Sequence, residues 1–220
     1  MQIKNINRYI YKIGGLSIPN LLKQKFFVFD LEATGLNPKT ESIIQIADIP
    51  IVNGRICSKM AFDSFIHSPK KIPPAISRLT DISNKDIEKA PELKIILNKL
   101  WKKYQDYIWV AQCGFEFDFE ILEMAAKKNK IPYFKPKKLD TKVLFAYLHP
   151  ELNTTFSTDF LKNYYKVEFT DLKRHTALGD AILIARILKK MLEEFRSKGF
   201  SNLIIKKTLS IKKFIPKSLN

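Results

Sequence analysis

Short, almost wholly apolar runs in this chain are followed by longer segments whose apolar residues recur at helical spacing. The clearest run, residues 26–33, reads FFVFDLEA and is interrupted by acids only at Asp30 and Glu32. Such a run predicts a strand buried on both faces in the middle of an α/β sheet. Residues 107–111 predict another short strand. Helical spacing after Asp118, and again from residue 177 to residue 195, predicts two helices, of which the second is long and amphipathic.

Two acidic residues stand at the C-terminal end of the first run. Side chains alternate across a strand, so Asp30 and Glu32 are expected on the same face. Two carboxylates in one small space are costly unless cations neutralise them or one holds a proton, and hard oxygen ligands favour Mg²⁺ or Mn²⁺. The alternative is an exposed strand end with solvated acids. Thr34 and Gly35 end the strand, where a glycine can adopt a positive φ and let a substrate backbone approach.

Three further residues stand where they can complete a metal site. Asp118 lies at or near a helix start, where an aspartate either caps the helix or faces the site. Asp180 shares the core side of the long helix with Ile184 and Leu188, and an acid on a core face needs a partner. His175 lies just before that helix, where an imidazole can act as a general base near neutral pH.

These segments resemble the three motifs of the DnaQ-like 3′–5′ exonucleases, in the DEDDh branch that carries a histidine in its last motif. Asp30 and Glu32 match the D-x-E of the first motif, and Asp118 matches the aspartate of the second. His175 and Asp180 match the H-x-x-x-x-D of the third. The resemblance covers roughly residues 25–192, and residues 42–47 and 139–141 resemble the second and fifth strands of the family.

The resemblance implies a ribonuclease-H-like α/β fold, in which α-helices flank a five-stranded mixed β-sheet and the active site lies at the strand ends. It also implies two Mg²⁺ (or Mn²⁺) ions, with His175 deprotonating the water that attacks the terminal phosphodiester. The products would be nucleoside 5′-monophosphates. The implied metal ligands are Asp30, Glu32, Asp118 and Asp180, which together with His175 make up the catalytic set.

Five residues beside the motifs are candidates for substrate binding. Leu36, directly after Thr34 and Gly35, resembles the apolar wedge that family members place against the terminal base. Where this chain has Cys113, family members usually carry an asparagine that helps to position substrate; the alternative role for the thiol is that of a small buried group. Phe117 is a candidate for stacking on a base, although most phenylalanines are expected in the core.

Charge and the positions of the motifs divide the chain into three parts. The formal net charge is +16, of which residues 1–24 carry +4 and residues 195–220 carry +7, both without an acid. We expect a basic N-terminal extension (1–24), a DEDDh exonuclease domain (25–195) and a basic C-terminal tail (196–220). Basic flanks suit a nucleic acid, and a lysine-rich soluble surface is the alternative. The tail can lie back on the domain or dock on a partner, such as a polymerase subunit.

Composition narrows the setting and the class of function. Two cysteines argue against a disulfide framework, and no apolar stretch has the length that crosses a bilayer. We expect a cytoplasmic protein, nucleoid-associated if bacterial, with organellar import left open by the acid-free residues 1–24. The leading function is trimming of DNA 3′ ends in proofreading or repair; the alternatives are the same activity on RNA, or a catalytically weak nucleic-acid-binding subunit. The clustered acids favour an enzyme.

Overall fold

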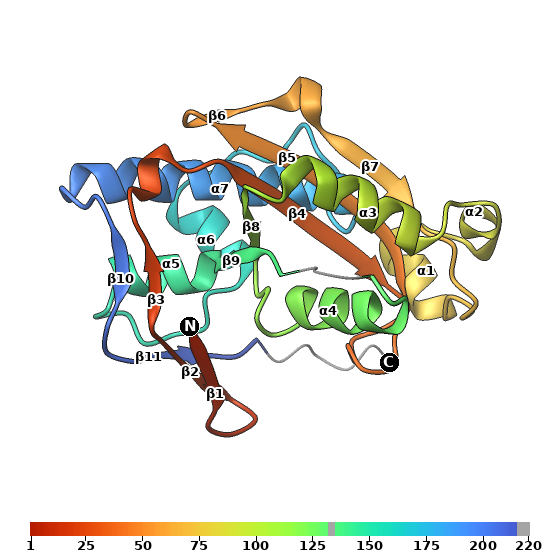
Figure 1. Cartoon of the computed structure of the whole chain (residues 1–220), viewed down its shortest axis with the longest axis horizontal. Helices are drawn as coiled ribbons and strands as arrows, with labels where there is room; N and C mark the ends of the chain where they lie inside the picture. Colours follow the sequence, from red (N-terminus) through yellow and green to blue (C-terminus); the bar gives the residue numbers. More distant parts are fainter. Residues whose placement is uncertain (132–134, 215–220) are drawn as a thin grey trace.

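A central mixed β-sheet organises the computed structural model of this chain, which describes residues 1–131 and 135–214 (Figure 1). Its strands, in chain order, are β4 (Phe26–Ala33), β5 (Ile43–Val52), β6 (Arg55–Ile56), β7 (Phe62–Phe65), β8 (Ile108–Ala111) and β9 (Lys137–Asp140). Their order across the sheet is β6-β5-β4-β8-β9, and β7 also pairs with β5. β4 is antiparallel to β5 and parallel to β8, which in turn is parallel to β9.

Among the described residues, six strands form the sheet, but they occupy the five positions across it that the sequence predicts. β6 and β7 both pair with the edge of β5 that β4 leaves free, at residues 51–52 and 45–48 respectively. Asn53 and Gly54, with φ of 51° and 71°, form the tight turn from β5 to β6. The expected mixed sheet is confirmed, and its outer position is shared by two short strands.

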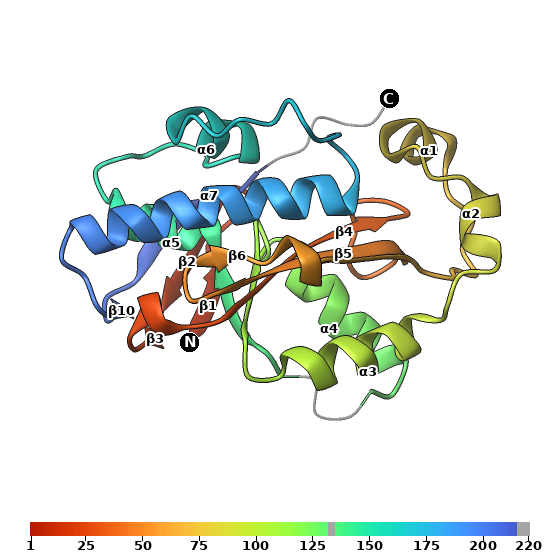
Figure 2. The same ribbon diagram turned by 90° about the horizontal axis from the view of Figure 1, so that it is seen from above.

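Helices cover both faces of the sheet (Figure 2). One face carries α5 (Thr141–Leu148), α6 (Thr158–Tyr164) and the long α7 (Ala177–Ser197), and the other carries α3 (Leu93–Tyr104) and α4 (Asp118–Lys128). Alternation along β4 supplies both cores, because Val28 packs towards α7 whereas Phe27 and Phe29 pack towards α3. The remaining helices are α1 (Pro74–Thr80), α2 (Asn84–Glu88) and the 3₁₀ turns η1 (Leu21–Lys23) and η2 (Ser58–Met60).

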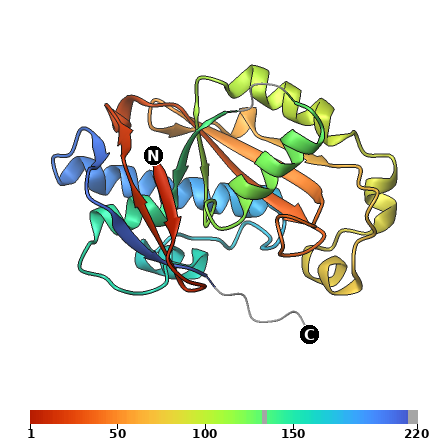
Figure 3. The ribbon, with the colours of Figure 1, turned by 60° about the horizontal axis from the view of Figure 1, so that its bottom comes forward.

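The two ends of the chain meet in small sheets beside α5 and α6 (Figure 3). β1 (Gln2–Asn5), β2 (Ile10–Gly14) and β11 (Leu209–Lys212) form one antiparallel sheet, and β3 (Leu16–Ile18) pairs with β10 (Leu203–Ile205). Ile13 and Ile211 are fully buried in the same core as α5 and α7. Of the two arrangements considered for the tail, its described part lies back on the domain. The boundaries at residues 24 and 196 stay a prediction.

The local predictions for the motif segments are confirmed. The run at residues 26–33 is β4, the run at 107–111 contains β8, and helices begin at Asp118 and Ala177. Among the helices that the structure describes, none combines the length and the apolar character needed to cross a membrane.

Candidate active site

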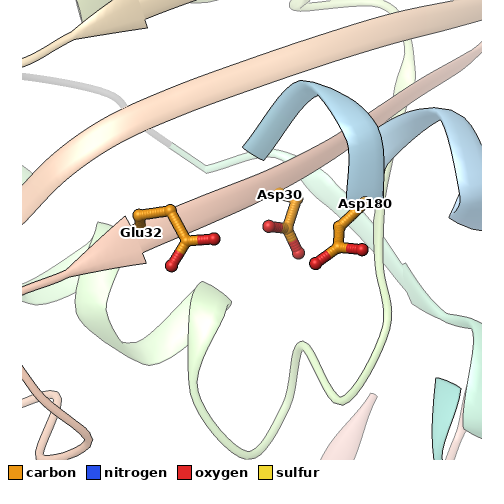
Figure 4. A group of neighbouring side chains, drawn as sticks. All are labelled: Asp30, Glu32 and Asp180. Carbon is orange, nitrogen blue, oxygen red and sulfur yellow. The ribbon is translucent and has the colours of Figure 1, made fainter. Parts of the chain in front are cut away.

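Three carboxylates from β4 and α7 share one space (Figure 4). Asp30 and Glu32 leave the face of β4 that α7 covers, and Asp180 lies in the first turn of α7. One oxygen of each residue lies within 4.8 Å of the others. The register between β4 and β5 shifts directly after Glu32, so the strand is irregular where the site begins. We call Asp30, Glu32 and Asp180 the acid cluster.

Burial raises the pKa of every carboxyl in the acid cluster, and repulsion by neighbouring carboxylates adds to the rise at Asp30 and Glu32. The pKa of Asp30 lies well above its usual range, first because it is buried and then because of the charges of Asp118, Glu32 and Asp180. Burial, followed by the charges of Asp180 and Asp118, raises the pKa of Glu32 to about 8. The pKa of Asp180 is also raised, mainly by burial. The cluster therefore lacks positive charge, a condition that a bound cation relieves.

Among the described residues, Arg174 supplies the positive charge that pairs with the cluster, and it was not among the residues predicted from the sequence. Its Nε lies 2.7 Å from Asp180 Oδ1, and its Nη1 donates a hydrogen bond to Asp159 Oδ1 at 2.8 Å. The Nε–Oδ1 contact is a buried ion pair. The charge of Arg174 lowers the pKa of Asp30 and Glu32, but one guanidinium opposes three acids. Its position directly before His175 was the only signal in the sequence.

His175 lies on the loop before α7 with its side chain exposed. Its φ of 58° is in the left-handed region, and its backbone N–H donates to Asp180 Oδ2 at 3.1 Å. Thr176 caps α7 by accepting a hydrogen bond from Gly179 N at 3.2 Å. A Cβ atom on Gly179 would lie 2.1 Å from Lys173 O, so only glycine lets this loop pack against the helix. The role of the imidazole as a base stays a prediction.

Asp118 is buried at the start of α4, next to the acid cluster but not among the three residues whose oxygens meet. The N-cap position belongs to Phe117, so the alternative role of Asp118 as a helix cap does not hold. Burial, followed by the charge of Asp140, raises the pKa of Asp118 to about 7. Its charge in turn contributes to the raised pKa of Asp30. Its part as a fourth ligand stays a prediction.

The residues after β4 differ from expectation in one respect. Gly35 does not adopt a positive φ, contrary to the expectation from its place at a strand end. A Cβ atom there would lie 3.0 Å from the side chain of Glu41, so lack of space is the reason for glycine. Thr34 is buried, and its hydroxyl donates to Glu41 Oε2 at 2.6 Å. Leu36 is 51% exposed, as a wedge against a base would need to be.

The loop of the second motif holds the other two substrate candidates. Cys113 adopts φ of 57°, and burial raises the pKa of its thiol well above the usual value, so the thiol is neutral. Phe117 is partly buried against the core under α4. Gln112 ties this loop to the segment before α6, because its Nε2 donates to Phe156 O at 2.7 Å. Whether Cys113 and Phe117 contact substrate stays a prediction.

The acid cluster fits a divalent cation. All its donors are carboxylate oxygens, which are the ligands that Mg²⁺ and Mn²⁺ prefer. Asp180 Oδ1 is buried, and its ion pair with Arg174 brings only one positive charge to the three acids. Three buried carboxylates beside one guanidinium are costly, and a metal ion would remove that cost.

Curated relatives with similar sequences are long bacterial polymerase chains. The chain is 29% identical over 186 residues to a "DNA polymerase III PolC-type" of Ureaplasma parvum, covering 84% of this chain and 13% of that protein. It is 31% identical over 183 residues to a "DNA polymerase III subunit epsilon-like protein" of Rhodobacter capsulatus, covering 81% of this chain and 25% of that protein. The chain thus spans a quarter or less of the length of these relatives.

Solved structures share the fold at low identity. The nuclease domain of 3′hExo, described as a DEDDh family member bound to rAMP, superposes with a TM-score of 0.69 at 17% identity, covering 85% of this chain and 98% of that one. Exonuclease X in complex with 5′ overhanging duplex DNA superposes with a TM-score of 0.60 at 20% identity, covering 80% and 93%. The ribonuclease-H-like fold is therefore confirmed. The exonuclease family model RNase T matches residues 27–188, three quarters of the chain, and the chain belongs to this exonuclease family.

Proposed function

We propose that this chain is a metal-dependent 3′–5′ exonuclease that releases nucleoside 5′-monophosphates from the 3′ end of DNA. The acid cluster carries this proposal, because three buried carboxylates within 4.8 Å of one another lack the positive charge that would balance them. Membership of the exonuclease family supplies the reaction class. The clustered acids and their raised pKa values have no evident purpose in a protein that only binds nucleic acid.

Each residue at the site has a part in this proposal. Asp30, Glu32 and Asp180 would hold two Mg²⁺ or Mn²⁺ ions, with Asp118 as the fourth ligand. When bound, two such ions stabilise the attacking and leaving oxygens of an in-line displacement at phosphorus. His175 would accept the proton of the attacking water, since its backbone bond to Asp180 Oδ2 keeps the residue next to the cluster.

DNA is the substrate we propose first, because the curated relatives described above are named as DNA polymerase III chains. A polymerase subunit is by the same argument the proposed protein partner. RNA is the second candidate, since one solved structure with the same fold is described as bound to rAMP. Contact with a 2′-hydroxyl would decide between the two.

The direct test is degradation of 5′-labelled single-stranded DNA, mispaired duplex DNA and RNA in Mg²⁺, Mn²⁺ or EDTA. We expect stepwise shortening from the 3′ end that requires metal and is at least about a thousandfold slower in Asp30→Asn. The matched control is Asp106→Asn, which removes an exposed carboxylate paired with Lys25 at the starts of β8 and β4, whereas the acid cluster lies toward the end of β4.

Two outcomes would reject this assignment. Shortening that persists at the wild-type rate in Asp30→Asn would place catalysis elsewhere. Tight binding without cleavage of any of the substrates would instead support a catalytically weak binding subunit.

A further inference from the structure

A pocket of about 430 Å³ lies where the two ends of the chain meet, away from the acid cluster. The turn between β1 and β2, the end of β11 and the segment before α6 build it. We call it the terminal pocket, and its polar and aromatic lining consists of Tyr9, Thr155, Ser157, Lys212, Lys213 and Phe214. None of its lining residues is acidic.

Two exposed aromatic rings line this pocket, with Lys213 in the lining and Arg8 beside it. Tyr9 is 46% exposed and Phe214 is 48% exposed, so large parts of both rings are open to solvent. The guanidinium of Arg8 lies 4.5 Å from the centre of the Tyr9 ring. No acidic side chain in the described part of the chain pairs with Arg8 or Lys213.

Hydrogen bonds from the last residue of β11 and from the residue after it hold the lining of the pocket in place. Lys213 N donates to Tyr9 O at 2.7 Å, which joins the end of β11 to the turn that carries Tyr9. Lys212 Nζ donates to Asn153 O at 2.9 Å, which joins the same strand to the segment before α6. Tyr9 and Phe214 are therefore on backbone that other elements hold, as a binding site requires.

Three short connections link the terminal pocket to the candidate active site. Phe214 N donates to Glu116 Oε2 at 2.7 Å, and Glu116 is two residues before Asp118. Phe156, between Thr155 and Ser157, accepts the hydrogen bond from Gln112 in the second motif loop. Asp159, two residues after Ser157, accepts from Arg174, which contacts Asp180.

We propose that the terminal pocket binds the unpaired strand that continues from the nucleotide held at the acid cluster. Tyr9 and Phe214 would stack on bases, and Arg8 and Lys213 would neutralise phosphates. Exposed aromatic rings interleaved with cations are the contacts that bind single-stranded nucleic acid without sequence preference. The two lysines of the lining and its lack of acids match the negative charge of this occupant. This inference rests on the proposed function for its account of why a strand lies there.

Binding of a 5′-fluorescent oligothymidylate of about ten nucleotides, measured by anisotropy in EDTA, tests the pocket separately from catalysis. We expect Tyr9→Ala/Phe214→Ala to weaken binding by about tenfold or more, and Tyr9→Trp/Phe214→Trp to retain it, since tryptophan also stacks. Lys213→Ala should lower the slope of log affinity against log salt by about one. The matched control is Ile204→Ala/Lys207→Ala, which removes an exposed apolar residue from β10 and a lysine from the connection between β10 and β11.

A small substrate separates this inference from the proposed function. Hydrolysis of the p-nitrophenyl ester of thymidine 5′-monophosphate in Mg²⁺ should be unchanged in Tyr9→Ala/Phe214→Ala, because this substrate is too short to reach the pocket. No hydrolysis by the wild type would reject the proposed function and leave the binding result standing. The pocket assignment would be overturned if the pocket variant bound the oligonucleotide as tightly as wild type, or if the control variant lost as much affinity. It would also be overturned if the pocket variant lost as much affinity for a blunt duplex, because paired bases present no free ring faces.

Discussion

Two groups of buried charges in this molecule are built in opposite ways. The acid cluster gathers three carboxylates beside a single arginine. Lys142 is fully buried as well, but it pairs with Glu116 and donates to Lys212 O at 2.8 Å. The second carboxylate oxygen of Glu116 accepts from Phe214 N. We call Lys142, Glu116 and these two backbone groups the Lys142 node.

The difference separates a structural charge from a functional one. Every charge in the Lys142 node has a partner within the chain, so burial is compensated and the C-terminal segment is attached to the second motif loop. The acid cluster keeps raised pKa values although Arg174 pairs with Asp180, so the rest of its compensation must come from outside the chain. Buried charge by itself identifies neither kind of site; the balance of partners does.

The largest expected effect comes from opening the Lys142 node. Lys142→Met leaves Glu116 buried without its cation, and breaking a buried pair in this way costs roughly 3–5 kcal/mol of unfolding free energy. Urea unfolding measures it. The double variant Lys142→Met/Glu116→Gln should recover much of the loss, because it removes both charges and keeps an acceptor for Phe214 N. If Lys142→Met were as stable as wild type, the buried pair between Lys142 and Glu116 would not form in solution.

The acid cluster should respond to metal instead. Mg²⁺ or Mn²⁺ at about a hundred times its dissociation constant should stabilise the wild type by roughly 3 kcal/mol, because the ion binds only the folded state. Thermal unfolding with and without EDTA measures the shift. Asp180→Asn should lose most of this metal-induced stabilisation, and Asp106→Asn should lose none of it. An equal metal-induced stabilisation of wild type and Asp180→Asn would contradict the distinction between the acid cluster and the Lys142 node.

Asp48 offers a third buried charge, outside both groups. It is fully buried on β5, its Oδ1 accepts from the Tyr104 hydroxyl at 3.1 Å, and burial raises its pKa to about 7. A raised carboxyl pKa stabilises the fold below the unfolded value of about 4, and this stability is lost as pH rises through about 7.

Asp48→Asn should therefore gain stability relative to wild type over that interval, by about 1.4 kcal/mol per pH unit and about 4 kcal/mol at most. Urea unfolding of both proteins across the interval is the measurement, with Asp106→Asn as the reference. If the difference in unfolding free energy between Asp48→Asn and wild type did not grow with pH, the charge of Asp48 would be compensated within the chain, as that of Lys142 is.

The smallest expected effect concerns the loop that carries Arg174 and His175. Gly179→Ala places a Cβ atom against Lys173 O, so the loop must move although alanine favours the helix. We expect about a tenfold loss of exonuclease rate, or about 1.4 kcal/mol in the barrier, with the metal-induced stabilisation retained. If the rate and the metal-induced stabilisation were both lost, the loop would help to build the acid cluster. If neither were lost, the position of the loop would not affect the reaction.

The local part of the site could be predicted from sequence because its physics is local. Asp30 and Glu32 share a face since side chains alternate along any strand, and Asp180 lies on the core side since helical spacing places it there. Gly35 shows the limit, because its neighbour Glu41, and not its backbone angle, explains the glycine. Arg174 was missed for the same reason: its partners Asp159 and Asp180 lie on two other elements.

The sequence by itself determined the order of the strands and helices around the motifs, the three motif segments and the mixed α/β sheet. The tertiary structure alone decided that residues 10–18 pair with residues 203–212, that Lys142 is compensated and that Asp118 stands outside the three meeting carboxylates. Apolar periodicity reports which way a side chain points within its own element. Contacts between residues about two hundred positions apart leave no such trace, because they depend on how separate elements pack.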